Sequence, residues 1–316
     1  MNVMEKMEKE GEALPLVSVV VGVYNKERYV GETLRSVRAQ TYPHWELLVV
    51  DDASTDGSLK EVERALEGER RAQVLRMERN SGHPGVARNR GIREARGKYV
   101  AFLDADDVWK PGKLDLQVRF MEENPEVDIS HTRCEVIDGA GKSRGLRHGE
   151  TLPEGEEVLA ALLRHCFICT STVMVRREFG ATTGWFSEEA CFHSGQDYEF
   201  FVRCARDGQV GLVNEVLTLY RQFEGTVSRN TRNWRARPSD FVRKKLFLAR
   251  EDLWSSALPV GEMRRIVWEA AEENAQYWRA KGEWGKALWF TWEMVKLRPW
   301  TMRTWWQVGG TSLRRR

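Results

Sequence analysis

Three aspartates lie close together in the stretch Asp104-Ala-Asp106-Asp107, directly after the apolar run 98–103. Burying an unpaired carboxylate costs several kcal/mol, so we expect all three side chains to lie outside the core. A dense group of carboxylate oxygens suits a hard divalent cation, which often keeps a phosphate as a further ligand. The cluster therefore predicts a metal site at the end of a strand.

A second acidic pair, Asp51-Asp52, ends another apolar run, 45–50. In open α/β sheets, ligands bind outside the carboxyl ends of the strands. Two acidic strand ends in one such sheet predict a single shared site for a nucleotide and a metal ion.

The elements that would carry these residues follow a regular order. Apolar, β-branched runs predict strands, and amphipathic segments between them predict helices. The predicted strands are 16–24, 46–50, 73–77 and 98–103, and the predicted helices are 30–40, 59–66 and 85–95. This alternation gives a mostly parallel sheet with right-handed crossovers, so the fold class is α/β and Rossmann-like. We place this half at 14–110, after a flexible tail at 1–13.

The pattern changes from Pro111 onward. Helices are predicted at 113–123, 156–164 and 196–206, and strands at 127–136, 170–175 and 216–220, with a turn at 138–142. We assign 111–230 to a second half of the same domain. The remainder, 231–316, is predicted to be a helical C-terminal extension.

The composition is that of an ordinary globular protein, with 41% hydrophobic and 30% charged residues. The net charge of +2 argues against nucleic acid as the main partner. Five cysteines at irregular spacing do not form a disulfide framework, which favours a reducing, cytoplasmic location. Cys166-Phe-Ile-Cys169 has no second pair at metal-ligand spacing, so we expect buried strand thiols there. No stretch reaches the roughly 18 consecutive apolar residues that cross a bilayer.

Several short motifs occur in one order, and together they resemble glycosyltransferase family 2. They are 17–25, 36–42, 48–57, 80–91, 102–107 and 195–203. Each motif is weak alone, whereas the ordered series is specific. The resemblance implies a GT-A fold, a nucleotide-sugar donor and inversion at the anomeric carbon. It makes 14–110 the nucleotide-sugar-binding half and 111–230 the acceptor-binding half.

The resemblance also implies roles for the acidic residues. Asp106 is the predicted ligand of Mn²⁺ or Mg²⁺, which would bridge both phosphates and offset charge on the leaving diphosphate. Asp104 is predicted to contact the ribose, or the metal indirectly. Asp52 is predicted to accept the N3–H of the base, which suits uracil or thymine and leaves guanine N1–H open. UDP- and dTDP-sugars are therefore the favoured donors, with GDP-sugars as a further option.

Two other side chains complete the predicted donor site. Tyr24, at the end of the first strand, is predicted to stack on the base, with a core-edge aromatic as the alternative. Arg88 lies in a glycine-flanked helix start, where phosphates bind favourably. It is predicted to pair with the diphosphate or with Asp104, with a purely structural ion pair as the alternative. His83, just before this helix, is more simply an incidental loop residue.

Asp197 is the predicted general base. An inverting transfer needs a carboxylate to take the proton of the acceptor hydroxyl as that oxygen attacks the anomeric carbon. The alternative is a first-turn aspartate favoured by the helix dipole. Family members often carry Glu-Asp here, and Gln196-Asp197 keeps the base. Trp185 and His193 are candidates to line the acceptor pocket, and Tyr220-Arg221 is predicted to be structural.

The C-terminal extension is rich in tryptophan and basic. Residues 281–316 hold six of the thirteen tryptophans, and eight Lys or Arg against two Asp or Glu. We predict an amphipathic basic helix with these apolar and basic residues: Trp284, Leu288, Trp292, Val295 and Trp300, with Lys286, Lys296, Arg298 and Arg303. Three interpretations stay open: contact with an anionic membrane surface, a helical hairpin packed on the catalytic domain, or a partner surface.

The sequence thus predicts a cytoplasmic, metal-dependent, inverting glycosyltransferase, with a peripheral position on the inner face of the membrane as an option. Its acceptor would be a glycan or a lipid-linked sugar. Two alternatives stay open. One is a non-catalytic module that keeps the nucleotide pocket as a scaffold. The other is a sugar nucleotidylyltransferase, which needs a Gly-rich, basic loop that Tyr24-Asn-Lys-Glu27 does not supply. The donor sugar, the acceptor, the linkage and the oligomeric state are left open.

Overall fold

The computed structural model of the chain describes residues 13–147, 152–155, 157–189, 195–223, 245 and 247–297. Of the predicted tail 1–13, all but Ala13 lies outside these residues. The chain divides into two compact units. The first consists of Met1–Val158 and Cys166–Asn230, and the second of Leu159–His165 and Thr231–Arg316. A short piece of the predicted acceptor-binding half therefore belongs to the second unit.

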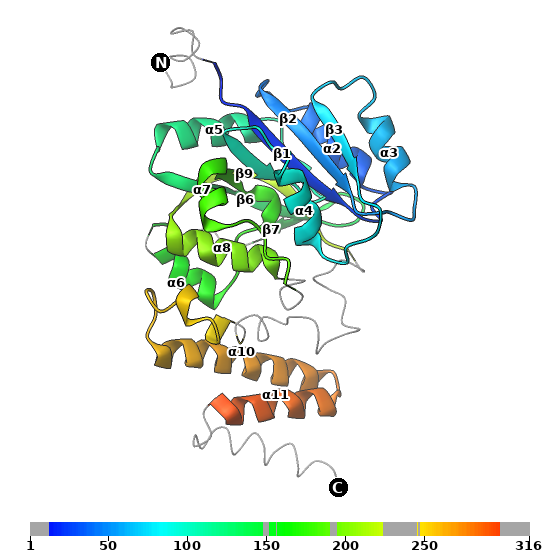
Figure 1. The fold of residues 1–316 in the computed structure, drawn as a ribbon. Helices are drawn as coiled ribbons and strands as arrows, with labels where there is room; N and C mark the ends of the chain where they lie inside the picture. Colours follow the sequence, from blue (N-terminus) through cyan, green and yellow to red (C-terminus); the bar gives the residue numbers. More distant parts are fainter. Residues whose placement is uncertain are drawn as a thin grey trace. The chain divides into compact units, whose positions relative to one another are not determined.

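The first unit is built on a nine-stranded sheet with the order β3-β2-β1-β4-β8-β6-β9-β5, and β7 pairs with β6 (Figure 1). The strands are β1 (Val17–Val23), β2 (Trp45–Asp51), β3 (Ala72–Arg76), β4 (Tyr99–Phe102), β5 (Val108–Trp109), β6 (Val127–Ile137), β7 (Ser143–Leu146), β8 (Met174–Arg176) and β9 (Gln209–Arg221). The first four strands pair in parallel, and β9 is parallel to β6. Antiparallel pairs join β8, β7 and β5 to their neighbours. The predicted α/β class is confirmed.

Helices of the first unit cover both faces of the sheet (Figure 1). They are α2 (Val30–Arg38), α3 (Ser58–Ala65), α4 (Pro84–Ile92), α5 (Lys113–Glu123), α7 (Arg177–Thr183) and α8 (Gln196–Asp207). A further helix, α6 (Glu157–Arg164), belongs mostly to the second unit. Successive side chains of a strand point to opposite faces. On β1, Val19 and Val21 pack in one core with Leu34 of α2. Val20 points the other way, toward Gly91 of α4, where an added Cβ would lie 2.7 Å from Val20 Cγ1.

The predicted strand 170–175 is wrong in its first half. Thr170–Thr172 forms a 3₁₀ turn, η1, and only Met174–Arg176 is a strand. The Thr172 hydroxyl donates to the Cys169 carbonyl at 2.6 Å, and such local bonds compete with strand pairing. Cys169 is buried and Cys166 is half-buried, and neither belongs to a strand. The prediction of strand thiols is therefore also wrong.

The second unit contains η3 (Glu251–Leu253) and a hairpin of α10 (Val260–Ala280) and α11 (Trp284–Leu297) (Figure 1). Gly282, with φ at +73°, turns the chain between the two helices. In α11 the buried face carries Ala287, Phe290 and Met294 at helical spacing. α11 packs against α10.

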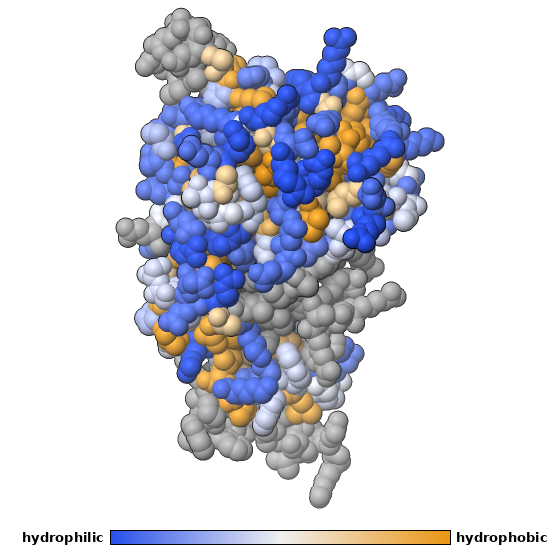
Figure 2. All heavy atoms as spheres, in the orientation of Figure 1, coloured by the Kyte–Doolittle hydropathy of each residue, from blue (hydrophilic) through white to orange (hydrophobic). Residues whose placement is uncertain are grey.

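Two residues of the predicted apolar face of this helix, Trp284 and Trp292, are 37% and 59% exposed, so this face lies away from the buried one. Figure 2 shows hydrophobic residues among hydrophilic ones over this part of the molecule. Trp300, Arg298 and Arg303 lie outside the described residues. Within the described part of the chain, none of the helices combines the length and apolar character that crossing a membrane requires.

Candidate active site

The loops after β1 and β2 meet at the carboxyl edge of the sheet. Asn25 and Ala53 take φ values of +51° and +54°, which are uncommon for residues other than glycine. Asn25 Oδ1 accepts the Thr55 N–H at 2.8 Å, and the Asn25 N–H donates to Ser54 Oγ at 3.1 Å. These bonds hold the two loops against each other.

Asp52 is 5% exposed and carries several hydrogen bonds. Its Oδ1 accepts the Ser81 N–H at 2.8 Å, and its Oδ2 accepts the Ser81 hydroxyl at 2.8 Å and the Asn80 amide at 3.0 Å. A carboxylate has about four acceptor positions, so one is left for a further donor. Asp52 thus also fixes the loop that leads into α4. Tyr24, at the same edge, is 44% exposed and lies outside the core.

Arg88 joins two of the predicted site residues. Its Nη2 donates to Asp104 Oδ1 at 2.5 Å. Burial opposes the charged guanidinium, but the carboxylates of Asp104 and Asp197 outweigh it, so the pKa of Arg88 is raised. The ring of Phe186 lies 5.2 Å from the guanidinium carbon. The structure therefore brings Asp104, Arg88 and Asp197 into one cluster.

Asp197 lies in the first turn of α8 and faces the η1 turn. Its Oδ2 accepts the Thr170 hydroxyl at 3.3 Å, and its Oδ1 accepts the N–H of Tyr198 at 2.8 Å. This position is compatible with both interpretations, the general base and the aspartate favoured by the helix dipole, because a first-turn carboxylate can interact with the dipole and still face neighbouring groups. Thr170 orients the carboxylate, and no sequence signal pointed to it.

Asp106 pairs with Lys26 of the loop after β1. Lys26 Nζ lies 2.5 Å from Asp106 Oδ2, and the two side chains are 27% and 14% exposed. Burial raises the pKa of the Asp106 carboxyl, and the ammonium group of Lys26 opposes that rise. Behind the loop, Arg221 Nε donates to the Asp106 carbonyl at 2.8 Å. Lys26 was not predicted as a site residue.

Asp107 is fully buried, so the expectation that all three aspartates lie outside the core is wrong. The Ser171 hydroxyl donates to its Oδ2 at 2.5 Å, and the Arg221 N–H donates to its Oδ1 at 2.8 Å. Burial raises the pKa of this carboxyl well above its usual range. The two donors replace water, which removes much of the cost of burial. Asp107 anchors the loop, and it leaves Asp104 and Asp106 to face the site.

The remaining predicted residues have structural contacts. His83 caps α4, because its Nδ1 accepts the Gly85 N–H at 3.2 Å. Trp185 packs against the rings of Phe102 and Phe200, with centroids 6.2 Å and 6.0 Å away. His193 lies outside the described residues.

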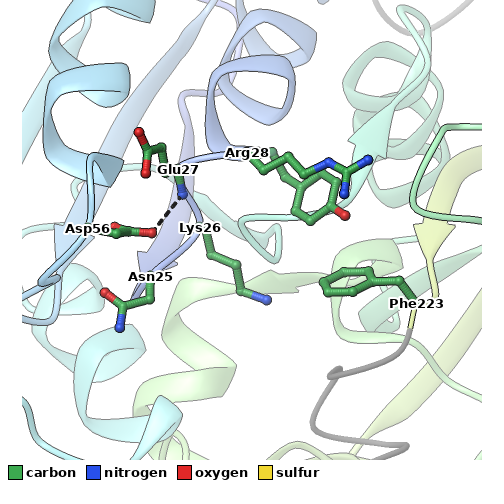
Figure 3. A pocket seen from close by; sticks show the side chains of 7 residues that line it. Asn25, Lys26, Glu27, Arg28, Asp56 and Phe223 are labelled. Atoms are coloured by element: carbon green, nitrogen blue, oxygen red, sulfur yellow. Dashed lines mark hydrogen bonds between the residues drawn. The ribbon is translucent and has the colours of Figure 1, made fainter.

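A pocket of about 470 Å³ opens beside Lys26, the partner of Asp106 (Figure 3). It is lined by Asn25, Lys26, Glu27, Arg28, Tyr29, Asp56 and Phe223. None of the residues predicted to bind the donor or the metal lines it. Lys26 connects the pocket to the predicted site, because it lines the pocket and its amine pairs with Asp106.

The donor set suits Mg²⁺ or Mn²⁺ in type, since Asp104 and Asp106 supply only oxygen ligands. Among the described residues, no three His, Cys, Asp or Glu side chains come together as a ready-made metal site. An ion held by Asp106 would therefore need further ligands from a bound diphosphate and water. The pair with Lys26 would also have to open.

The family comparison decides the class of this site. The model of "Glycosyl transferase family 2" matches residues 18–181, which contain the acidic strand ends and the η1 turn. The chain belongs to glycosyltransferase family 2. It is therefore a glycosyltransferase, and the nucleotidylyltransferase alternative is set aside.

Two relatives agree with this family. The putative teichuronic acid biosynthesis glycosyltransferase TuaG of Bacillus subtilis is 34% identical over 75% of this chain and 88% of its own length. The UDP-Glc:alpha-D-GlcNAc-diphosphoundecaprenol beta-1,3-glucosyltransferase WfgD of Escherichia coli is 30% identical over 68% of this chain and 80% of its own. In two longer glycosyltransferases from Rickettsia species the match spans 33% of the relative's length.

Solved structures show the same fold. TarS of S. aureus, in complex with UDP-GlcNAc, superimposes with a TM-score of 0.66 at 21% identity, over 89% of this chain and 81% of that one. The first unit is thus a GT-A fold, as the sequence predicted.

Proposed function

We propose that this family 2 glycosyltransferase moves a sugar from a nucleotide-diphosphate donor to a hydroxyl of a glycan or lipid-linked acceptor, with inversion. The observation that carries the proposal is the buried Arg88, which interacts with Asp104 and with Asp197. One cation that is bonded to Asp104 and feels the charge of Asp197 supports a single site in which the leaving diphosphate and the acceptor meet.

A UDP-sugar is the donor that we favour, with dTDP- and GDP-sugars as alternatives. Asp52 would accept a hydrogen bond from the base, and Tyr24 would stack on it. Asp104 would contact the ribose or reach the metal indirectly. The name of WfgD gives UDP-Glc as its donor, and TarS binds UDP-GlcNAc, which supports this choice.

The acceptor that we favour is a cell-envelope polysaccharide or its lipid-linked precursor. The names of the relatives TuaG and WfgD support this choice.

Asp106 would hold Mn²⁺ or Mg²⁺ together with the donor diphosphate. The bound ion supplies positive charge that stabilises the leaving diphosphate. Arg221 Nε donates to the Asp106 carbonyl, which holds the backbone that carries the carboxylate.

Asp197 would act as the base. The acceptor hydroxyl gives its proton to the Asp197 carboxylate, its oxygen bonds to the anomeric carbon, and the bond from that carbon to the diphosphate oxygen breaks on the opposite face. The Thr170 hydroxyl, which donates to Oδ2, would keep the carboxylate oriented.

Calorimetric binding of UDP, dTDP and GDP, each with Mn²⁺ and with EDTA, tests the donor site. We expect UDP to bind, and to bind more tightly with Mn²⁺. Absence of binding to all three nucleotides would contradict the donor site and favour a protein that keeps the fold as a scaffold.

The Asp197→Asn variant tests the base. We expect transfer to fall by roughly 10²- to 10⁴-fold, with the Kd for UDP little changed. Asp207→Asn, at the other end of α8, is the matched control and should transfer normally. Full activity of Asp197→Asn would exclude this residue as the base.

We further propose that the second unit touches an anionic membrane surface on the cytoplasmic side, which would hold it near a lipid-linked acceptor. Trp284, Leu288 and Trp292 follow each other at four-residue steps on the face of α11 away from its buried residues. Exposed Lys281 lies near the start of this helix. Co-sedimentation with phosphatidylglycerol vesicles should exceed that with phosphatidylcholine vesicles, and Trp292→Ser should reduce it. Equal binding to both vesicles would contradict the proposal.

A further inference from the structure

Lys26 holds a positive charge beside Asp106, the carboxylate that we propose as the metal ligand. Its ammonium nitrogen lies 2.5 Å from Asp106 Oδ2. Asp106 is the less exposed of the two side chains, at 14%. A divalent cation and the ammonium group cannot both occupy this oxygen, because like charges this close repel each other.

The backbone of Lys26 is held independently of its side chain. Its N–H donates to Ser58 Oγ at 2.6 Å. Its carbonyl accepts the N–H groups of Tyr29 and Val30, both at 2.9 Å, at the start of α2. The side chain can therefore change rotamer while the loop after β1 stays in place.

The pocket of about 470 Å³ offers the Lys26 amine a second position (Figure 3). In Figure 3 the side chains of Lys26 and Phe223 point toward each other across it. Already in its position beside Asp106, the amine lies 5.7 Å from the centroid of the Phe223 ring, within the range of a cation–π interaction, so this contact can persist when the amine leaves the carboxylate. Glu27 and Asp56 also line the pocket, together with Arg28, so a displaced ammonium would meet two acidic groups and one basic group.

We propose that Lys26 is a tethered counter-ion of Asp106, which a divalent metal must displace. The protein would then bind the metal weakly until the donor diphosphate is present, since the diphosphate brings the negative charge that both cations need. Metal and donor would enter as a coupled pair. This inference rests on the proposed role of Asp106 as a metal ligand.

Titration of the nucleotide-free protein with Mn²⁺, followed by electron paramagnetic resonance of the free ion, tests the inference without any measurement of activity. We expect Lys26→Met to lower the Kd for Mn²⁺ by roughly tenfold, because one competing, half-buried ion pair is lost. Lys26→Arg keeps the charge and should bind Mn²⁺ as weakly as the wild type. Lys60→Met, at an exposed position of α3, is the matched control and should also match the wild type.

Adding UDP tests the coupling. UDP should lower the Kd for Mn²⁺ more in the wild type than in Lys26→Met. Combining Lys26→Met with Asp106→Asn should remove the gain in affinity. An unchanged Kd in Lys26→Met, or a gain that survives Asp106→Asn, would overturn the role of Lys26 and leave the proposed function standing. If the wild type binds no Mn²⁺ even with UDP, the metal proposal itself fails, and the role of Lys26 fails with it.

Discussion

At the scale of single residues, one hydroxyl group holds two parts of the site. Ser171 Oγ accepts the Asp104 N–H at 3.0 Å and donates to the buried carboxyl of Asp107 at 2.5 Å. We expect Ser171→Ala to lower the free energy of unfolding by about 1–3 kcal/mol, because the Asp107 carboxyl loses a buried partner. The Kd for UDP should rise, since Asp104 loses its support. Urea denaturation and calorimetry measure the two effects.

Thr182→Ala is the control for this change. Thr182 is exposed on α7, and its hydroxyl donates to the Glu178 carbonyl one turn away at 3.1 Å. Its loss should change the stability by less than about 0.5 kcal/mol. A similar loss in both variants would mean that Ser171 has no special role.

The same residues show how far a sequence can predict a site. Asp104 and Asp106 stand out because they share one short motif at a strand end. The burial of Asp107 depends on Ser171 and Arg221, which are 64 and 114 residues away along the chain. No local pattern contains such partners, so the sequence predicted a third solvent-facing carboxylate. Lys26 was visible in its loop, but its pairing with Asp106 spans 80 residues.

At the scale of elements, α4 needs a residue without a side chain where it crosses β1. An added Cβ at Gly91 would lie 2.7 Å from Val20 Cγ1, on a short branched side chain in the sheet. We expect Gly91→Ala to cost about 1–3 kcal/mol of stability. The Kd for UDP should also rise, because Arg88 lies one turn earlier on the same helix. Denaturation and calorimetry again give both values.

Gly112→Ala is the matched glycine change. Its nearest contact would be Leu116 Cδ1 at 3.9 Å, an ordinary van der Waals distance. Gly112 is the N-cap of α5, where alanine is less favourable than glycine by less than about 1 kcal/mol. Gly112→Ala should therefore cost less stability than Gly91→Ala. An equal loss in both variants would show that α4 can move away from β1 without cost.

The connection between α3 and β3 depends on an ion pair. Hydrogen bonds from the Arg71 side chain to Glu69 lower the pKa of Glu69 to about 2. A carboxylate with a lowered pKa stabilises the fold above its unfolded pKa of about 4.3, and this effect is lost as the pH falls toward the folded value. We expect Glu69→Gln to cost about 1 kcal/mol at neutral pH, because Arg71 is partly exposed. Urea denaturation at neutral pH and at about pH 3 should show the difference shrinking. The same difference at both would contradict the ion-pair explanation.

The elements that the sequence predicted well are those whose signal is local. β1 and β2 read as continuous apolar runs because both of their faces are covered by protein. β9 begins seven residues before the predicted strand. The prediction missed this first part because Gly211, Asn214 and Glu215 break the apolar pattern. Its pairing with β6 maintains it, with register shifts along the way. Such long-range pairing cannot be read from one segment.

At the scale of the whole molecule, the second unit has a core of its own. Phe290 is fully buried in it, whereas Trp292, two residues later on α11, is 59% exposed. We expect Phe290→Ala to cost about 3–5 kcal/mol. Amide hydrogen exchange should then become faster in α10 and α11. Trp292→Ser should leave the exchange rates there nearly unchanged. Equal effects of the two changes would contradict the packing of the hairpin.

The order of the chain through the two units has a consequence for its synthesis. Leu159–His165 belongs to the second unit, while the chain on both sides of it belongs to the first. Leu162 and Leu163 are fully buried in the finished protein. A growing chain leaves the ribosome from its N-terminus, so these leucines emerge before the rest of their unit exists. They therefore wait for the rest of their unit until Thr231–Arg316 has been made, and a shortened chain that stops after Asn230 would lack the larger part of that unit.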